Sequence, residues 1–133
     1  MACSVEYTDE FGDWWKTLDD GEQEDVVAYV TLLEERDVRR GFTHSSAIRA
    51  SRHEHMRELR VQSGGRPVRV FYAFDPRRMA ILLIGGDKTG DDRFYERFVP
   101  IADRLYDDHI DTLRREGLLP CLVGIRSRIC ARE

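Results

Sequence analysis

Hydrophobic residues in the first third of the chain recur at helical spacing. The pattern i, i+3, i+4, i+7 of one apolar helical stripe is met by Phe11, Trp14, Trp15 and Leu18. Thr8 stands where an N-cap residue belongs, and residues 4–8 before it predict a short strand. The two tryptophans are therefore interpreted as core residues.

A second helix is predicted after an interruption at residues 19–21. Asp20 and Gln23 can form a capping box at its start. Its apolar face comprises Val26, Tyr29, Val30 and Leu33. The two helices together predict a helical hairpin, and residues 41–55 after it are polar and irregular.

The spacing changes to strand-like alternation between residues 56 and 86. Leu59 and Val61 alternate with polar neighbours, and Ser63-Gly64-Gly65 predicts a hairpin turn because glycine adopts positive φ readily. In the next strand, residues 67–74, one face is predicted to carry Val68, Val70, Tyr72 and Phe74, and the other Arg69 and Phe71.

The third strand of this predicted meander, residues 79–86, is apolar on both faces and is placed inside the sheet. Residues 75–78 form the turn before it. A last helix is predicted beyond residue 92, broken or kinked at Pro100. Its stripe comprises Phe94, Phe98, Ile101, Leu105 and Tyr106. The fold class is α+β: an N-terminal strand and helical hairpin, a three-stranded antiparallel meander and a C-terminal helix.

Length and composition limit the kinds of protein that this chain can be. With 133 residues, 41% of them hydrophobic, the chain suits one compact domain with one core, which we place at residues 1–115. Residues 116–133 form an extension, interpreted as a disordered end, an extra helix or a read-through product. Acidic residues near the N-terminus argue against a signal peptide and predict a cytoplasmic protein. Cys3, Cys121 and Cys130 are interpreted as reduced thiols.

The motif Asp87-Lys88-Thr89-Gly90 matches the start of the phosphorylated loop of P-type ion pumps. A pump needs membrane spans of about 20 apolar residues, and the longest apolar run here, residues 79–84, is strand-sized. A Walker loop has the pattern G-x-x-x-x-G-K-[ST]. It is excluded because the only glycines just before Lys88 are Gly85 and Gly86, which do not have that spacing. A lysine at the end of an apolar strand still requires an explanation.

Charge is unevenly distributed along the chain, which carries −4 overall. Residues 1–35 hold eleven acidic residues and one lysine, a local charge of −10. Residues 49–78 hold eight arginines and three acidic residues, a local charge of +5. This asymmetry indicates either a face that binds a polyanion or two segments that pair with each other.

Strand alternation places Arg60 and Arg69 on neighbouring strands, with Glu58 on the same side as Arg60. Lys88 follows the last strand and Tyr95 opens the helix beyond it. Several cations and a phenol suit a phosphodiester, whose oxygens accept charge-assisted hydrogen bonds. The alternative is that both arginines are solvated cross-strand residues that pair with Glu58.

The ordered set Glu58-Leu59-Arg60, Arg69-Val70-Phe71-Tyr72 and Ile81-Leu82-Leu83 leading to Gly85-Gly86-Asp87-Lys88 resembles the RelE/ParE superfamily of toxins. Within it, the chain is most similar to the phage-related HigB-type branch. The resemblance implies an endoribonuclease that cleaves messenger RNA at the ribosome without a metal or cofactor. It also implies a cognate antitoxin, of the HigA-like helix-turn-helix kind, and no membrane partner.

The resemblance assigns roles to individual residues. Arg69 matches the strand arginine that contacts the scissile phosphate, and Lys88 the cation that stabilises its charge. Tyr95, with Phe94 as competitor, matches the aromatic residue that orients the RNA, and Arg60 a basic position on the preceding strand. Glu58 stands where well-known members carry a lysine as general base.

Further RNA contacts are predicted at Arg57, Arg66 and His53, in addition to Phe94. His53 and His55 are substitute bases because histidine titrates near neutrality. As a metal site the two histidines lack a third ligand, so no metal is expected.

Two other functions remain open. The chain is alternatively a non-catalytic, gyrase-inhibiting ParE-type toxin, or an inactive prophage-derived protein that only binds an antitoxin. Converging cations at Arg60, Arg69 and Lys88 favour the nuclease. We expect Arg69 and Lys88 to be dispensable for the core, so that replacing either costs about 0.5 kcal/mol or less, as for surface changes.

Overall fold

The computed structural model describes residues 4–35, 45–53 and 55–118. These residues form three helices and five strands. In order they are β1 (Val5–Tyr7), α1 (Asp9–Lys16), α2 (Asp20–Glu35), β2 (Ser45–Ala47), β3 (Arg57–Ser63), β4 (Arg66–Phe74), β5 (Ala80–Asp87) and α3 (Phe94–Arg115).

The five strands form one sheet in the order β1-β5-β4-β3-β2. Strands β2 to β5 pair antiparallel, and β1 alone pairs parallel, with β5. The predicted α+β class, meander and interior position of β5 are confirmed. β2 was not predicted; it is a three-residue edge strand within the segment expected to be irregular.

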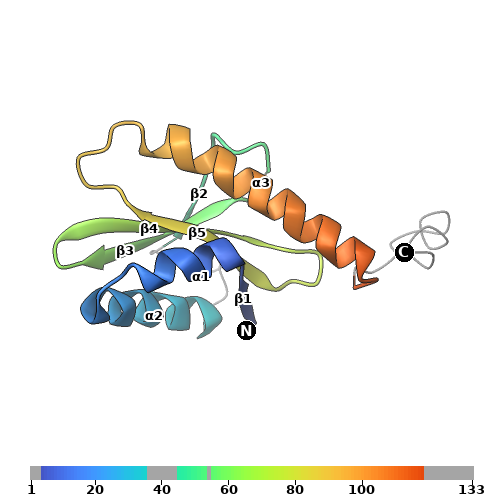
Figure 1. Ribbon diagram of the computed structural model, residues 1–133, viewed down its shortest axis with the longest axis horizontal. Helices are drawn as coiled ribbons and strands as arrows, with labels where there is room; N and C mark the ends of the chain where they lie inside the picture. The colour runs from blue at the N-terminus through green and yellow to red at the C-terminus, as the bar shows by residue number, and fades with distance from the viewer. Residues whose placement is uncertain (1–3, 36–44, 54, 119–133) are drawn as a thin grey trace.

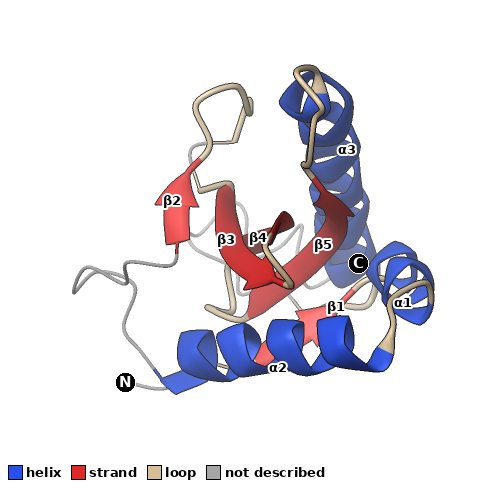
Figure 2. Ribbon diagram, turned by 90° about the vertical axis from the view of Figure 1, so that its left-hand side faces the viewer, coloured by secondary structure: helices blue, strands red, loops and turns tan. Residues whose placement is uncertain are grey.

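Helices cover both faces of the sheet. Figure 1 shows α1 and α2 on one side of the sheet and α3 on the other, and the turned view in Figure 2 agrees. Each face has its own hydrophobic cluster, one around Leu59, Val70 and Tyr72 under α1 and α2, the other around Phe71 and Leu83 under α3. The expectation of one core is therefore wrong, because the sheet is buried on both sides.

Both helices of the hairpin have the predicted type of N-terminal cap, but only the cap of α1 lies at the predicted residue. The Thr8 hydroxyl accepts a hydrogen bond from Phe11 N at 3.0 Å, which confirms the N-cap. The capping box of α2 lies one residue earlier than expected: Asp19 N donates to Glu22 Oε1 at 3.0 Å and Glu22 N donates to Asp19 Oδ1 at 2.7 Å. Asp20 is instead the first helical residue.

The β3–β4 turn uses the two predicted glycines, whose φ angles are 57° at Gly64 and 79° at Gly65. Such angles suit the two-residue hairpin turn that matches strand twist. Pro100 lies inside α3, which continues to Arg115, so it does not end the helix. Within the described residues that follow, Leu118 N donates to Leu113 O at 2.9 Å, closing α3 with a Schellman motif.

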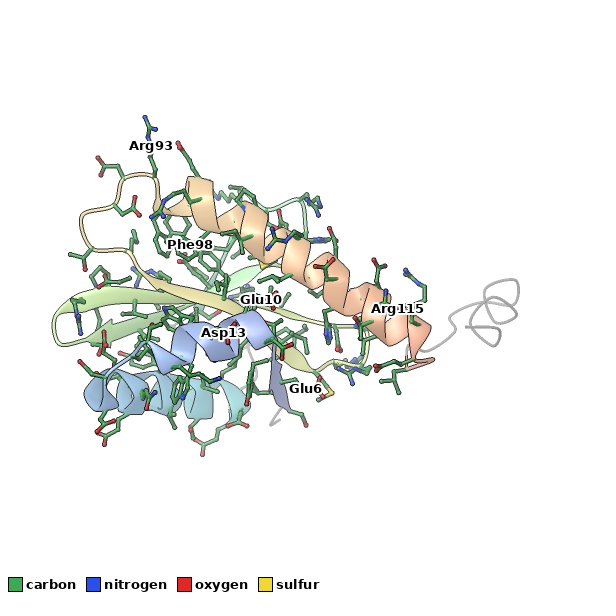
Figure 3. The ribbon with its side chains drawn as sticks, viewed as in Figure 1. Glu6, Glu10, Asp13, Arg93, Phe98 and Arg115 are labelled. Carbon is green, nitrogen blue, oxygen red and sulfur yellow. The ribbon has the colours of Figure 1, made fainter. Side chains whose placement is uncertain are left out.

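Two consecutive glycines at the end of β5 allow both helical layers to approach the sheet. A Cβ on Gly85 would lie 2.3 Å from Trp14 Cζ3, and one on Gly86 would lie 2.8 Å from Phe98 Cζ. Figure 3 shows Phe98 between α3 and the sheet. Gly86 therefore fixes how closely the first turns of α3, including Tyr95, pack against β5.

The β4–β5 turn, at the other end of these strands, is organised by the buried carboxylate of Asp75. Arg77 donates to Asp75 Oδ2 at 2.8 Å and also to Glu6 Oε1 at 2.8 Å, which connects the turn to β1. His109 Nε2 lies 3.1 Å from Asp75 Oδ2, which connects the turn to α3.

The three cysteines and residues 119–133 of the predicted extension lie outside the described residues. No helix in the described part of the chain is both long and apolar enough to cross a membrane.

Candidate functional site

Glu58 joins three elements on the α3 side of the sheet. Its Oε1 atom accepts a hydrogen bond from the Tyr95 hydroxyl at 2.6 Å, and Arg69 Nε lies 3.3 Å from the same atom. Its Oε2 atom accepts from the Ser46 hydroxyl at 3.1 Å. The site therefore gathers side chains from β2, β3, β4 and α3 around one carboxylate.

Arg69 is buried, with 9% of its surface exposed. Its Nη1 group donates to Val68 O at 3.1 Å. Its Nε atom is close enough to Glu58 for an ion pair but, within the described residues, has no hydrogen-bond acceptor. The Arg69 guanidinium is thus held between the Val68 carbonyl and the Glu58 carboxylate.

Lys88 completes the cluster from the end of β5. Its ammonium lies 5.1 Å from the centroid of the Tyr95 ring, within the range of a cation–π interaction. Its backbone N–H donates to Pro67 O at 2.9 Å, which fixes the chain as it leaves the strand. Lys88 and Tyr95 are both partly exposed, whereas Glu58 and Arg69 are buried.

Arg60 adds positive charge beside this cluster. It pairs directly opposite Arg69 in the β3–β4 register and is exposed. Two cations facing each other across neighbouring strands concentrate positive charge on this face of the sheet.

The hydroxyl of Tyr95 is held in its neutral form. Burial, together with the hydrogen bond and negative charge of Glu58, raises the pKa of Tyr95 above its ordinary value, and Arg69 only partly opposes this. The phenol therefore keeps its proton, which it donates to Glu58.

Two predicted RNA-binding arginines lie on the opposite face of the sheet. Arg57 pairs opposite the buried Tyr72 and donates to Ser45 Oγ at 3.0 Å. Arg66 pairs with Glu22 of α2 at 2.7 Å. Alternation on β3 and β4 directs both side chains toward the α2 layer, so they do not join the Glu58 cluster.

His53 and Phe94 also differ from expectation. His53 Nε2 lies 2.9 Å from Asp107 Oδ1, and its ring packs against Tyr106, about 16 Å along α3 from Tyr95 at 1.5 Å per residue. Phe94 is fully buried, stacked on Phe71 and Phe98. Its ring belongs to the core, which leaves Tyr95 as the aromatic residue available to a ligand.

Much of the positive charge in residues 49–78 is paired within the fold. Arg66 contacts Glu22, and Arg77 contacts Glu6, so two ion pairs join this segment to the acidic first third. Arg52 pairs with Asp107. The alternative of pairing between the two segments is supported at Arg66 and Arg77, and the candidate site keeps Arg60, Arg69 and Lys88 as its cations.

Ser46 is a site residue that sequence reasoning missed. β2 is too short to show alternation, and a serine in a polar stretch carries no signal of its own. Within residues 4–35, 45–53 and 55–118, no group of three or more His, Cys, Asp or Glu side chains is arranged to hold a metal ion.

Comparisons with known proteins agree on one family. The model of the family described as phage-derived protein Gp49-like (DUF891) matches residues 13–107. The candidate toxin HigB2 of Mycobacterium tuberculosis is 38% identical over 99 residues, which are 73% of this chain and 49% of HigB2. The candidate toxin HigB3 of the same organism is 37% identical over 92 residues, which are 68% of this chain and 79% of HigB3. The match thus spans about half the length of HigB2.

Among solved structures, a double-arginine mutant of the Escherichia coli toxin RelE in the free state shares the fold. The TM-score is 0.53 with 11% identity, covering 85% of this chain and 99% of RelE. This likeness confirms the RelE-like arrangement of helices and sheet.

Proposed function

The chain belongs to the phage-derived Gp49-like family and is related to HigB toxins, and from that premise we propose that it is an endoribonuclease that cleaves messenger RNA. The observation that carries the proposal is the Arg69 guanidinium paired with Glu58, whose Oε1 atom also accepts a hydrogen bond from the Tyr95 hydroxyl. Partly exposed Lys88 and Tyr95 stand beside it.

These cations suit a phosphate group of the RNA as their ligand. RNA carries its own nucleophile, the 2′-hydroxyl, which attacks the adjacent phosphorus while the bond to the 5′ oxygen breaks. Arg69 and Lys88 would stabilise the added negative charge on the phosphorane, as donors in an oxyanion hole do. Arg60, exposed on the neighbouring strand, would hold the flanking phosphate.

Proton transfer would run through Tyr95 and Glu58 together. Glu58 is 7% exposed, so a bound RNA reaches the Tyr95 oxygen more readily than the carboxylate. As the 2′ proton passes to the Tyr95 oxygen, the phenol proton passes along the 2.6 Å hydrogen bond to Glu58 Oε1. Glu58 is then the final acceptor rather than the group that touches the sugar, which refines the role expected from sequence.

The leaving group also needs a proton. The Lys88 ammonium is a donor on the exposed side of the cluster and can protonate the 5′ oxygen as the P–O bond breaks. This division of roles needs Lys88 close to Tyr95, and the two groups are in contact.

A toxin of this kind requires a partner that neutralises it. We expect a cognate antitoxin of the helix-turn-helix type to cover the face bearing Arg60 and Lys88, and the ribosome to present the messenger RNA. An acidic antitoxin segment would suit a site of three cations, because complementary charge accelerates association.

Induction of the chain alone tests the proposed function. We expect growth arrest through translation, with transcript ends mapping inside translated regions. Arg69→Ala combined with Lys88→Ala should abolish these cuts while the protein remains expressed. Intact transcripts together with a gyrase-poisoning or DNA-damage signature would overturn the nuclease and favour the ParE-type alternative.

A further inference from the structure

The edge strand β2 presents two adjacent serines to opposite faces of the sheet. Ser46 donates to Glu58 Oε2 at 3.1 Å on the α3 side. Ser45 is bonded on the α2 side, where its hydroxyl lies 2.6 Å from the Tyr72 hydroxyl and accepts from Arg57 Nε at 3.0 Å. The same residue type at neighbouring positions thus serves two separate networks.

The Glu58 carboxylate has a partner on each oxygen. Oε1 is shared by Tyr95 and Arg69, and Oε2 is held by Ser46. The terminal torsion of a glutamate is soft, so packing alone does not fix which way the carboxylate plane faces. The Ser46 hydroxyl supplies this restraint from the side opposite Tyr95.

We propose that Ser46 is a positioning residue of this site, holding the Glu58 carboxylate so that Oε1 stays directed at Tyr95 and Arg69. The inference rests on the proposed ribonuclease function for its kinetic consequence. Its structural content, the orientation of Glu58 by Ser46, stands independently of that function.

The hydroxyl of Ser46 is not needed to hold β2 in the sheet. β2 pairs with β3 through Ser45 opposite Leu59, Ser46 opposite Glu58 and Ala47 opposite Arg57. Ile48 N donates to Met56 O at 3.0 Å just beyond the strand. Main-chain pairing therefore remains when the side chain is shortened, so Ser46→Ala should fold.

Three variants of β2 separate positioning from stability. Ser46→Ala should lower kcat about two- to tenfold with KM unchanged, the effect of one net hydrogen bond. Ser46→Thr retains a hydroxyl and should restore most of the rate. Ser45→Ala is the matched control on the opposite face: it should lower the melting temperature while the folded enzyme keeps its kcat.

A second measurement does not depend on cleavage. The carbon-13 chemical shift of Tyr95 Cζ reports the hydrogen bond of its phenol to Glu58 and can be assigned by its loss in Tyr95→Phe. We expect this signal to move in Ser46→Ala and to remain in place in Ser46→Thr and Ser45→Ala.

The outcomes distinguish this inference from the proposed function. An unmoved Tyr95 signal in folded Ser46→Ala would overturn the positioning role whatever the cleavage rate. A moved signal with unchanged kcat would overturn the kinetic part of the inference, since the orientation of Glu58 would not matter to the reaction. If the parent protein cuts no RNA, the proposed function fails, and the Tyr95 signal alone decides whether Ser46 orients Glu58.

Discussion

Arg69 and Glu58 form an ion pair within the sheet surface that α3 partly covers: Arg69 Nε lies 3.3 Å from Glu58 Oε1, and each side chain is 10% exposed. The pair is buried because β4 is covered on both faces, whereas alternation alone suggested a solvated arginine. Arg69 is thus a structural residue as well as a candidate catalytic one, and the expected stability cost of replacing it must be corrected.

Arg69→Ala should lower the free energy of unfolding by about 3 kcal/mol, the lower end for breaking a buried pair, because Glu58 would remain buried without its cation. Denaturant unfolding measures this loss. Adding Glu58→Gln to Arg69→Ala removes the uncompensated charge and should recover a substantial part of the loss. An unchanged denaturation midpoint in Arg69→Ala would show that the pair contributes nothing to folding.

Lys88→Ala should separate activity from stability. The substitution removes the cation–π contact between Lys88 and Tyr95, which is worth about 0.5–1 kcal/mol at an exposed site. It also removes one charge-stabilising donor, which should slow cleavage by roughly 10²–10³. The fully buried Val70 supplies the reverse control, since Val70→Ala should lower the melting temperature while the folded fraction keeps its rate. Normal cleavage by Lys88→Ala would remove Lys88 from the mechanism.

Tyr95→Phe should distinguish a proton-transfer role from a stacking role. The substitution keeps the ring that Lys88 and Phe71 contact but removes the hydroxyl that donates to Glu58. We expect kcat to fall by about 10²–10⁴, the range for general acid–base catalysis, while the dissociation constant for RNA stays close to that of the parent. A large loss of affinity with kcat preserved would assign Tyr95 to stacking alone.

The order of elements was predictable because each long element carries a regular period. Thr8 and the glycine pair at Gly64 and Gly65 were found from local chemistry, since capping and positive φ depend on neighbouring residues only. β2 was missed because three residues at a sheet edge show no period. The local charge of +5 was misleading, because ion pairs such as Arg66–Glu22 depend on tertiary contacts.

The candidate site, like the fold, could be predicted only in part from the sequence. Alternation correctly placed Glu58, Arg60 and Arg69 on one side of the meander, but it could not show that α3 leaves Arg60 exposed and buries Arg69. The sequence does not show which of the adjacent aromatic residues, Phe94 or Tyr95, faces the site. Only the packing of α3 against Gly86 decides which ring enters the core.

Asp75 should make stability dependent on acid pH. Burial would raise the pKa of this carboxyl, but hydrogen bonds from Arg77, His109 and the Met79 N–H together hold it below its ordinary 3.8. A depressed folded-state pKa stabilises the fold above the unfolded value, and this contribution is lost as pH falls through the folded value. We therefore expect the free energy of unfolding to decrease as the pH falls below about 4.

Asp75→Asn isolates this contribution from that of other carboxylates. The variant should be less stable than the parent at neutral pH, and the difference between the two should shrink as the pH falls below about 4. Urea unfolding at a series of pH values measures it. A difference that stays constant over this range would mean that ionisation of Asp75 does not stabilise the β4–β5 turn.

Gly85→Ala and Gly86→Ala form a matched pair that tests how the fold positions the site. The added methyl at Gly85 would meet Trp14 of α1 at 2.3 Å, whereas at Gly86 it would meet Phe98 Cζ at 2.8 Å and Phe94 Cε1 at 2.9 Å. Both variants should lose about 1–3 kcal/mol through overpacking. Only Gly86→Ala displaces the first turns of α3, and a shift of about 1 Å in Tyr95 would slow cleavage by about 10²-fold. Rates per folded molecule, measured beside melting temperatures, check this, and equal rates for the two variants would show that α3 packing does not position Tyr95.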